Sequence, residues 1–174
     1  MTLDVAEFLT LDVEASSLYG ESSYPISIGL AGPKDTWYRV ICPLPEWEEW
    51  DDLAAMLHGI DRDFLLAQGR DAFFVARELN ALLRDQTVLV DSEWDVFWIK
   101  KLFDEVGVTL AFSVELLSQH VSKAESDHIY QVIEEVDWPH VANEDAVLLR
   151  KIIVEAHARH TNAENASELT LGSA

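Results

Sequence analysis

Residues 8–42 read FLTLDVEASSLYGESSYPISIGLAGPKDTWYRVIC, and this stretch decides the fold. Three apolar segments, Phe8 to Glu14, Tyr24 to Leu30 and Thr36 to Cys42, are separated by short polar connections. Gly32-Pro33-Lys34-Asp35 is a turn signal, and the third segment alternates between two faces. The pattern predicts an antiparallel meander of three strands at the start of the chain.

After the meander the apolar period becomes helical. Pro43 and Pro45 interrupt the strand pattern, and the residues that follow predict short helices over Trp47 to Leu57 and Asp61 to Ala67. Asp71 is the predicted N-cap of the next helix, since its short acidic side chain precedes an apolar face at helical spacing.

From residue 87 onward, strands and helices alternate. Two short apolar strands are predicted at Thr87 to Val90 and Val108 to Phe112. The predicted helices are Ser92 to Val106, Glu125 to Val136 and Asn143 to about His160. Three consecutive strands followed by this alternation indicate an α/β fold, in which helices flank a mixed sheet.

Length and composition fit one domain in a reducing compartment. The chain has 174 residues, 49% of them apolar, and a single cysteine, Cys42. We expect one domain over residues 1–160 and a polar, flexible tail over residues 161–174. The start, Met1 to Glu7, does not resemble a secretory signal, and no apolar run approaches the ~20 residues of a membrane span. The expected location is the cytoplasm.

Acidic residues stand at the ends of the predicted elements. Asp12 and Glu14 are two apart in a strand, so both carboxylates face the same side and can bind one cation. Asp95 lies in the first turn of a helix, where the helix dipole also favours an acid. His140 precedes a helix whose first turn carries Asp145, and both side chains can face one pocket. Taken singly, each of these residues also fits a solvated or structural role.

Taken together and in order, these motifs resemble those of the DEDDh exonucleases, which include ribonuclease T, oligoribonuclease and the proofreading subunits of bacterial DNA polymerase. The first motif of that family, Asp-x-Glu, matches Asp12 and Glu14. The second matches Asp95, and the third, His-x-Ala-x-x-Asp-Ala, matches residues 140–146. Leu57-His58-Gly59-Ile60 resembles a His-Gly-Ile stretch found in many members. The resemblance covers the chain from about Phe8 to about His160.

Two places depart from the family pattern. Ala15-Ser16-Ser17 stands where the family often has Thr-Thr-Gly, and Val90-Asp91 stands where it often has His-Asn. Asp91 therefore adds a carboxylate near the site. These changes leave the five catalytic positions intact and bear on the choice of substrate.

The resemblance implies a ribonuclease H-like fold and a 3′→5′ exonuclease that releases nucleoside 5′-monophosphates from single strands, with RNA favoured over DNA. It implies two divalent cations, Mg²⁺ or Mn²⁺, and His140 as the general base. Crowded acids repel one another, and hard cations with oxygen ligands remove that repulsion. Leu18 and His58 are the candidate contacts to the terminal nucleotide. The implied metal ligands are Asp12, Glu14, Asp95 and Asp145.

The net charge of −20 is unusual for a nucleic-acid enzyme, because phosphate contacts normally require a basic surface. This charge predicts a preference for short single strands or 3′ overhangs, because such substrates need few phosphate contacts and the metals supply positive charge there. Arg62, Lys100, Lys101 and Arg150 are candidate phosphate contacts. A homodimer through the Trp-rich segment from Trp37 to Trp50 is a further expectation.

Three alternatives stay open. The chain acts as a 3′→5′ exodeoxyribonuclease, or it is an inactive nucleic-acid or protein scaffold of the same fold, or it is a metal-free α/β protein with acidic strand ends. The last reading has to explain three ordered motifs by chance.

Overall fold

The computed structural model describes residues 7–18 and 20–171, and its sheet begins with the meander that the sequence predicts. Strands β1 (Leu9–Ala15), β2 (Pro25–Ala31) and β3 (Thr36–Cys42) pair antiparallel in chain order. The turn between β2 and β3 is closed by a 2.9 Å hydrogen bond from the Gly32 N–H to the Asp35 carbonyl oxygen.

These strands belong to a mixed sheet with the order β4-β3-β2-β1-β5-β6. β5 (Thr87–Val90) lies parallel to β1, and β6 (Ser113–Leu116) lies parallel to β5. At the opposite edge, the two-residue β4 (Arg70–Asp71) pairs parallel with β3. β1 therefore joins the antiparallel meander to the parallel strands β5 and β6. This confirms the predicted α/β class, with a ribonuclease H-like mixed sheet flanked by helices.

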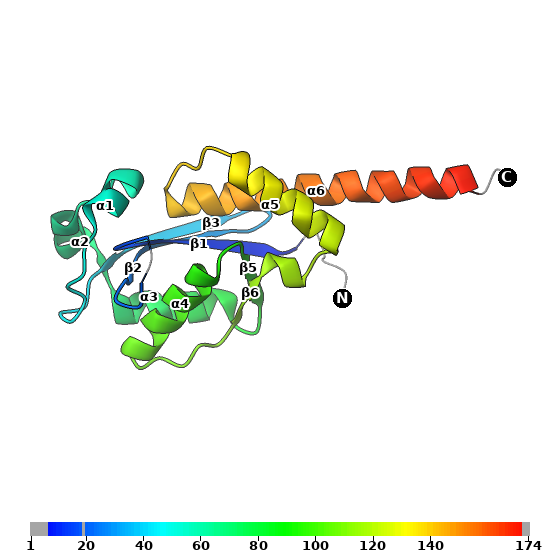
Figure 1. The fold of residues 1–174 in the computed structure, drawn as a ribbon. Coiled ribbons are helices and arrows are strands. Elements are labelled where there is room, and N and C mark those ends of the chain that lie inside the picture. Colours follow the sequence, from blue (N-terminus) through cyan, green and yellow to red (C-terminus); the bar gives the residue numbers. More distant parts are fainter. Residues whose placement is uncertain (1–6, 19, 172–174) are drawn as a thin grey trace.

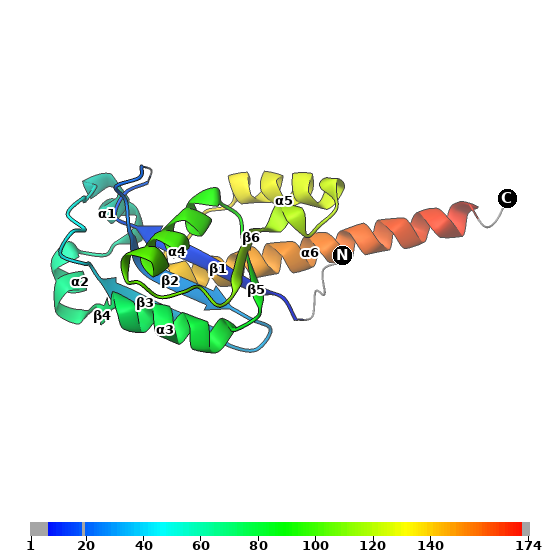
Figure 2. The ribbon, with the colours of Figure 1, turned by 90° about the horizontal axis from the view of Figure 1, so that it is seen from below.

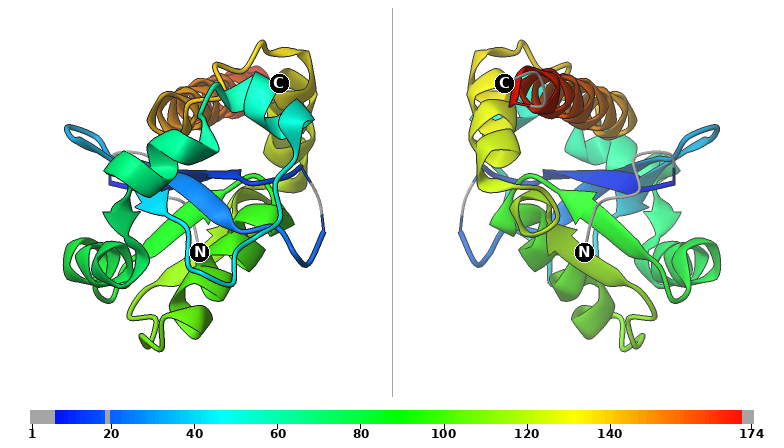
Figure 3. Two further views of the ribbon diagram at one scale, coloured as in Figure 1. Left: turned by 90° about the vertical axis from the view of Figure 1, so that its left-hand side faces the viewer. Right: turned by 90° about the vertical axis from the view of Figure 1, so that its right-hand side faces the viewer.

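Four helices cover the two faces of the sheet (Figures 1 and 3). α3 (Ala72–Leu83) and α4 (Glu93–Glu105) lie on one face, and Figure 2 shows them in front of the strands. α5 (Lys123–Glu135) and α6 (Ala142–Leu171) lie on the other face. Helices on both faces explain why every residue of β2 is buried.

Three shorter elements complete the fold. α1 (Asp52–His58) and α2 (Arg62–Gln68) lie at the end of the sheet where α6 begins (Figure 1). A single 3₁₀ turn, η1 (Leu117–Gln119), leads from β6 toward α5. The side chain of Asp71 accepts hydrogen bonds from the N–H groups of Phe73 and Phe74, which confirms it as the N-cap of α3.

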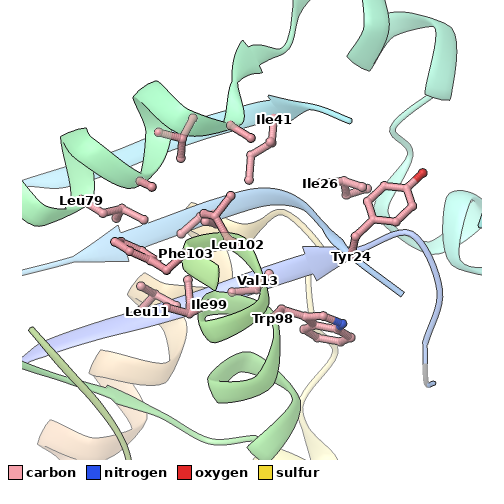
Figure 4. Close-up of a cluster of buried hydrophobic side chains, with 14 of the residues drawn as sticks. Leu11, Val13, Tyr24, Ile26, Ile41, Leu79, Trp98, Ile99, Leu102 and Phe103 are labelled. Carbon is pink, nitrogen blue, oxygen red and sulfur yellow. The ribbon is translucent and has the colours of Figure 1, made fainter. Parts of the chain in front are cut away.

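Each face of the sheet has its own apolar core. The larger core packs β1, β2 and β3 against α3 and α4, and its fully buried members include Leu11, Leu79 and Ile99 (Figure 4). The smaller core packs β5 against α5 and α6 and includes Ile129 and Ile153. Burial of a side chain of this size stabilises the fold by about 1.5–3 kcal/mol.

The strand predicted at Val108 to Phe112 is wrong, because these residues form the connection between α4 and β6. Their apolar character comes from packing on the core: Phe112 is buried, with its ring 5.7 Å from that of Phe103. The true edge strand, β6, begins one residue later at Ser113.

The helix predicted from Trp47 begins only at Asp52, after the N-cap Asp51. The Asp51 side chain accepts a 2.8 Å hydrogen bond from the N–H of Leu53, which fixes that start. Trp47 is buried and stacks on Tyr24 at 4.9 Å between ring centroids, so its apolar signal is a tertiary contact. The short strand β4 was not predicted.

α6 continues past the predicted end at about His160 and reaches Leu171 (Figure 1). The segment 161–171 contains no proline or glycine to stop the helix. Residues 172–174, the end of the predicted tail, lie outside the described residues. The division into a domain and a tail remains a prediction. Over the part of the chain that the structure describes, none of the helices has both the length and the apolar character that a bilayer crossing requires.

Candidate metal centre and active site

β1 presents two carboxylates to the face of the sheet that α6 covers. Asp12 and Glu14 alternate with Leu11 and Val13, which are buried in the core on the opposite face. The pairing register places Gly29 of β2 beside Asp12. The strand thus places apolar side chains in the larger core and carboxylates under α6.

Asp95, in the first turn of α4, is tied to β1 by a hydrogen bond. The N–H of Val13 donates to its Oδ1 at 3.2 Å, and the Asp95 side chain is buried. β1 pairs with β5 only at Leu9 and Thr10, so beyond Thr10 this edge of β1 is open to a side chain. One carboxylate oxygen is thereby held at the strand, and α4 fixes its position.

The loop before α6 and the first turn of that helix supply the other two predicted residues. His140 has a φ of 55°, in the left-handed region, and the helix begins two residues later at Ala142. Asp145 lies in the first turn and is buried. The hydroxyl of Thr10 donates a buried 2.7 Å hydrogen bond to the carbonyl oxygen of Ala146. This bond fixes the start of α6 on β1.

A first ligand group consists of Glu14, His140 and Asp145. Each offers one ligand atom, and these atoms all lie within 4.8 Å of one another. The group joins a strand to a loop and a helix that lie more than a hundred residues later in the chain.

A second ligand group consists of Asp12, Asp91 and Asp95, whose ligand atoms also lie within 4.8 Å of one another. Asp91, expected from the sequence to lie near the site, therefore offers a ligand atom to this group. The hydroxyl of Tyr130 on α5 donates a 3.0 Å hydrogen bond to the carbonyl oxygen of Asp91, which fixes the backbone there.

The crowding of these acids is visible in their pKa values. Burial raises the pKa of Glu14 to about 7, and repulsion from Asp145 adds to the shift. Burial likewise raises the pKa of Asp145 to about 6. The pKa of Asp12 is raised well above its ordinary value by burial and then by repulsion from Asp95, and burial and Asp91 raise that of Asp95. The folded chain holds these acids together at an electrostatic cost that bound cations would offset.

The donor set fits hard divalent cations. Apart from His140, every candidate ligand atom is a carboxylate oxygen, the donor that Mg²⁺ and Mn²⁺ prefer. Oδ1 of Asp145 is buried and has no hydrogen-bond partner, which leaves its lone pairs open to an ion. Asp12 is repelled by both Glu14 and Asp145, so the two ligand groups adjoin.

His58, the last residue of α1, lies beside the site and carries an unused donor. Its Nδ1 accepts a 3.1 Å hydrogen bond from the N–H of Ile60, which places the ring proton of the neutral form on Nε2. Burial lowers the pKa of His58 to about 4, and repulsion from His140 adds to that shift. Its Nε2 is buried and has no hydrogen-bond partner. Leu18, the other predicted substrate contact, follows β1 and is 41% exposed.

Sequence reasoning missed Tyr38. The register pairs Tyr38 with Gly29 and Gly29 with Asp12, so the phenol lies on the same face as the carboxylates. Burial raises its pKa, and the Glu14 carboxylate adds to the shift. Alternation along β3 puts Tyr38 on the face opposite Trp37, but only the register identifies which face carries the carboxylates.

The predicted phosphate contacts are mostly engaged elsewhere. Arg62 donates a 2.7 Å hydrogen bond to the Trp47 carbonyl oxygen, and Lys101 forms a 2.7 Å ion pair with Glu105. Arg150 lies over the ring of Phe8, 4.9 Å from its centroid. Lys100 remains exposed on α4.

Solved structures of exonuclease I share this fold. The E. coli enzyme in complex with a dT13 oligonucleotide matches with a TM-score of 0.69 at 12% identity over 92% of this chain. A zinc-bound complex of E. coli exonuclease I with single-stranded DNA gives 0.66 at 13% identity over 92%, and an apo exonuclease I gives 0.60 at 13% over 94%. This chain spans 43%, 42% and 47% of those three chains. No family model and no curated protein matches the sequence.

Proposed function

We propose that this chain is a 3′→5′ exonuclease that hydrolyses the terminal phosphodiester bond of a single strand and releases nucleoside 5′-monophosphates. The observation that carries the proposal is the convergence of four carboxylates and one histidine from β1, α4 and the start of α6. The likeness of fold to exonuclease I, which has been solved with single-stranded DNA, supports a single strand as the substrate.

Asp12, Glu14, Asp95 and Asp145 would hold two divalent cations, Mg²⁺ or Mn²⁺. When bound, such ions activate a water and stabilise the charge that develops on the phosphate and the leaving 3′ oxygen. Asp12 lies in one ligand group and is repelled by acids of the other, so it would hold an ion where the two groups adjoin. Asp91 adds a further carboxylate to the second group.

His140 would accept the proton from the attacking water. A ring nitrogen of His140 lies within 4.8 Å of ligand atoms of Glu14 and Asp145, so a water held by these carboxylates would lie within its reach. The left-handed backbone at residue 140 directs the side chain to the site from the loop, while α6 itself carries Asp145. Proton acceptor and metal ligand are thus positioned by adjoining but separate segments.

The terminal nucleotide would be held by His58 and Leu18. The neutral ring of His58 offers the Nε2 N–H as a hydrogen-bond donor that has no other partner. Leu18 offers an exposed apolar side chain to a base. Contacts of these two kinds read the end of a strand and little of its sequence.

Two properties of the substrate follow as proposals. The charge of −20 disfavours long polymers and supports short single strands or overhangs. The family resemblance favours RNA, whereas the solved complexes of similar fold hold DNA, and a direct comparison of rates decides between them. The homodimer stays a prediction.

The test is a 5′-labelled single strand of twelve thymidine or uridine nucleotides, incubated with Mg²⁺, Mn²⁺ or EDTA. We expect metal-dependent shortening from the 3′ end by wild type and by Asp35→Asn, a matched control at the exposed hairpin turn. Asp12→Asn should show none. If metal raises the melting temperature of wild type but neither strand shortens, the chain is a metal-binding scaffold and the proposal fails.

A further inference from the structure

A surface at the β4 edge of the sheet combines arginines with exposed aromatic rings, away from the carboxylates. Phe73 and Phe74, at the start of α3, are 40% and 47% exposed, and their rings pack edge to face at 5.6 Å. The guanidinium of Arg77 lies 5.7 Å from the Phe73 ring centroid, and that of Arg70 lies 5.1 Å from the Phe74 centroid. A guanidinium therefore lies over each ring.

The same surface continues onto β3. Nε of Arg70 lies 3.5 Å from Oε1 of Glu78, whose Oε2 accepts a 2.9 Å hydrogen bond from Nε of Arg39. Arg39 in turn lies 5.2 Å from the centroid of the Trp37 ring. An unbroken series of contacts thus links three arginines to three aromatic rings. We call it the arginine–aromatic surface, made of Trp37, Arg39, Arg70, Phe73, Phe74 and Arg77.

The charge of this surface opposes that of the rest of the molecule. Residues 70–84 carry three arginines and two acids, whereas the whole chain has 12 basic and 32 acidic residues. Arg39 adds another positive charge beside this segment. In a chain of net charge −20, a local excess of cations interleaved with exposed rings requires a specific explanation, since solubility does not need it.

We propose that the arginine–aromatic surface binds single-stranded nucleic acid outside the catalytic centre. Arginine contacts phosphates, and exposed aromatic rings stack on bases without reading their sequence, which is the combination that single-strand binding requires. The choice of a nucleic acid as partner rests on the proposed function. An acidic protein would need the arginines but not the aromatic rings.

The topology places this surface within reach of a strand held at the carboxylates. β1, β3 and β4 all run in the same direction, so their carboxyl ends lie at one end of the sheet. Glu14 pairs with Ser27 and Ser27 with Val40, and Arg70 pairs with the next residue, Ile41. Three strand spacings therefore separate the backbones of Glu14 and Arg70 across the sheet, a distance of roughly 14 Å. α3 covers the face opposite the carboxylates, so a strand bound at both places passes around the β4 edge. A strand of several nucleotides spans that distance, and a dinucleotide held at the catalytic centre does not.

The experiment measures binding of fluorescein-labelled dT20 by anisotropy in EDTA, so that the result does not depend on hydrolysis. We expect Arg70→Gln/Arg77→Gln and Phe73→Leu/Phe74→Leu each to weaken binding by about tenfold. The control, Lys123→Gln/Lys151→Gln, removes the same charge from exposed positions on α5 and α6 and should have a small effect. The arginine variant should also reduce the slope of log K against log salt by about 1.4, since each phosphate contact contributes ~0.7.

Two further measurements decide the interpretation. Cleavage of the dinucleotide dTpdT with Mg²⁺ should be the same in wild type and in both double variants. If the double variants lose dT20 binding but wild type shows no cleavage, the proposed function fails and the inferred binding surface still stands. Binding equal to that of the control variant would overturn the inference. So would a polyglutamate peptide that competes fully with dT20 while Phe73→Leu/Phe74→Leu binds normally, which would indicate an acidic protein as the partner.

Discussion

Gly29 of β2 lies directly against Ala142 at the start of α6: a β-carbon at residue 29 would lie 2.1 Å from the Ala142 carbonyl carbon. The obstacle is backbone and cannot rotate away. We expect Gly29→Ala to push α6 from the sheet and to destabilise the protein by about 3 kcal/mol or more. Thermal unfolding and single-turnover cleavage measure the two effects. In the control, Gly32→Ala, the added carbon meets a side-chain methyl group of Leu9 at 3.0 Å, and this variant should stay close to wild type.

Removal of the extra carboxylate should have opposite effects with and without metal. Asp91 raises the pKa of Asp95 by repulsion, so Asp91→Asn should stabilise the metal-free protein by about 1 kcal/mol. The same change removes a candidate ligand and should weaken Mg²⁺ binding by about tenfold. Melting temperatures in EDTA measure the stability of the metal-free protein, and melting temperatures in a Mg²⁺ titration measure the binding of Mg²⁺. A lower melting temperature in EDTA would contradict this account of the site.

The stability of the metal-free protein should fall as the pH rises. The pKa values of Glu14 and Asp145, about 7 and about 6, lie above the ordinary 4.5 and 3.8. A raised carboxyl pKa means that folding favours the protonated form. Its stabilising contribution is complete below the ordinary pKa and is lost as the pH rises through about 6 to 7. We expect the melting temperature in EDTA to decline from pH 5 to pH 8. Saturating Mg²⁺ should reduce that decline, and Glu14→Gln should remove part of it.

His58 should act on substrate binding more than on the chemical step. Asn at this position keeps an acceptor for the Ile60 N–H but removes the Nε2 donor. We expect His58→Asn to raise KM by about fivefold, the effect of one hydrogen bond, with kcat changed less. His58→Gln places its amide near the Nε2 position and should instead lower the melting temperature while KM stays closer to wild type. Equal KM values for the two variants would refute the assigned donor.

Local signals predicted most of the fold. Alternation gave the bounds of β3 correctly, and the short acidic side chain of Asp71 correctly marked the start of α3. Trp47 and the apolar residues of 108–112 misled the secondary-structure prediction, because loop residues that pack on a core carry the same apolar pattern as an element. Periodicity does not distinguish the two, since contact with the core, and not regular backbone, produces the signal.

The candidate site was predictable where the motif specified residue types. Asp12, Glu14, Asp95, His140 and Asp145 were all identified, and the structure brings them together. Their roles as ligands and base remain proposals. The pairing register of the strands could not be predicted from the sequence. That register places Tyr38 on the face of the carboxylates and Gly29 under α6. Proximity across strands depends on long-range pairing that no local pattern encodes.

The central place of β1 in the sheet has a consequence for how the site can open. β1 is hydrogen-bonded to β2 on one side and to β5 and Asp95 on the other, and its alternate residues belong to the core. The site therefore cannot come apart by fraying of an edge. The N–H of Val13 is bonded to the Asp95 side chain and not to a neighbouring strand, so native-state hydrogen exchange at Val13 should report release of that carboxylate.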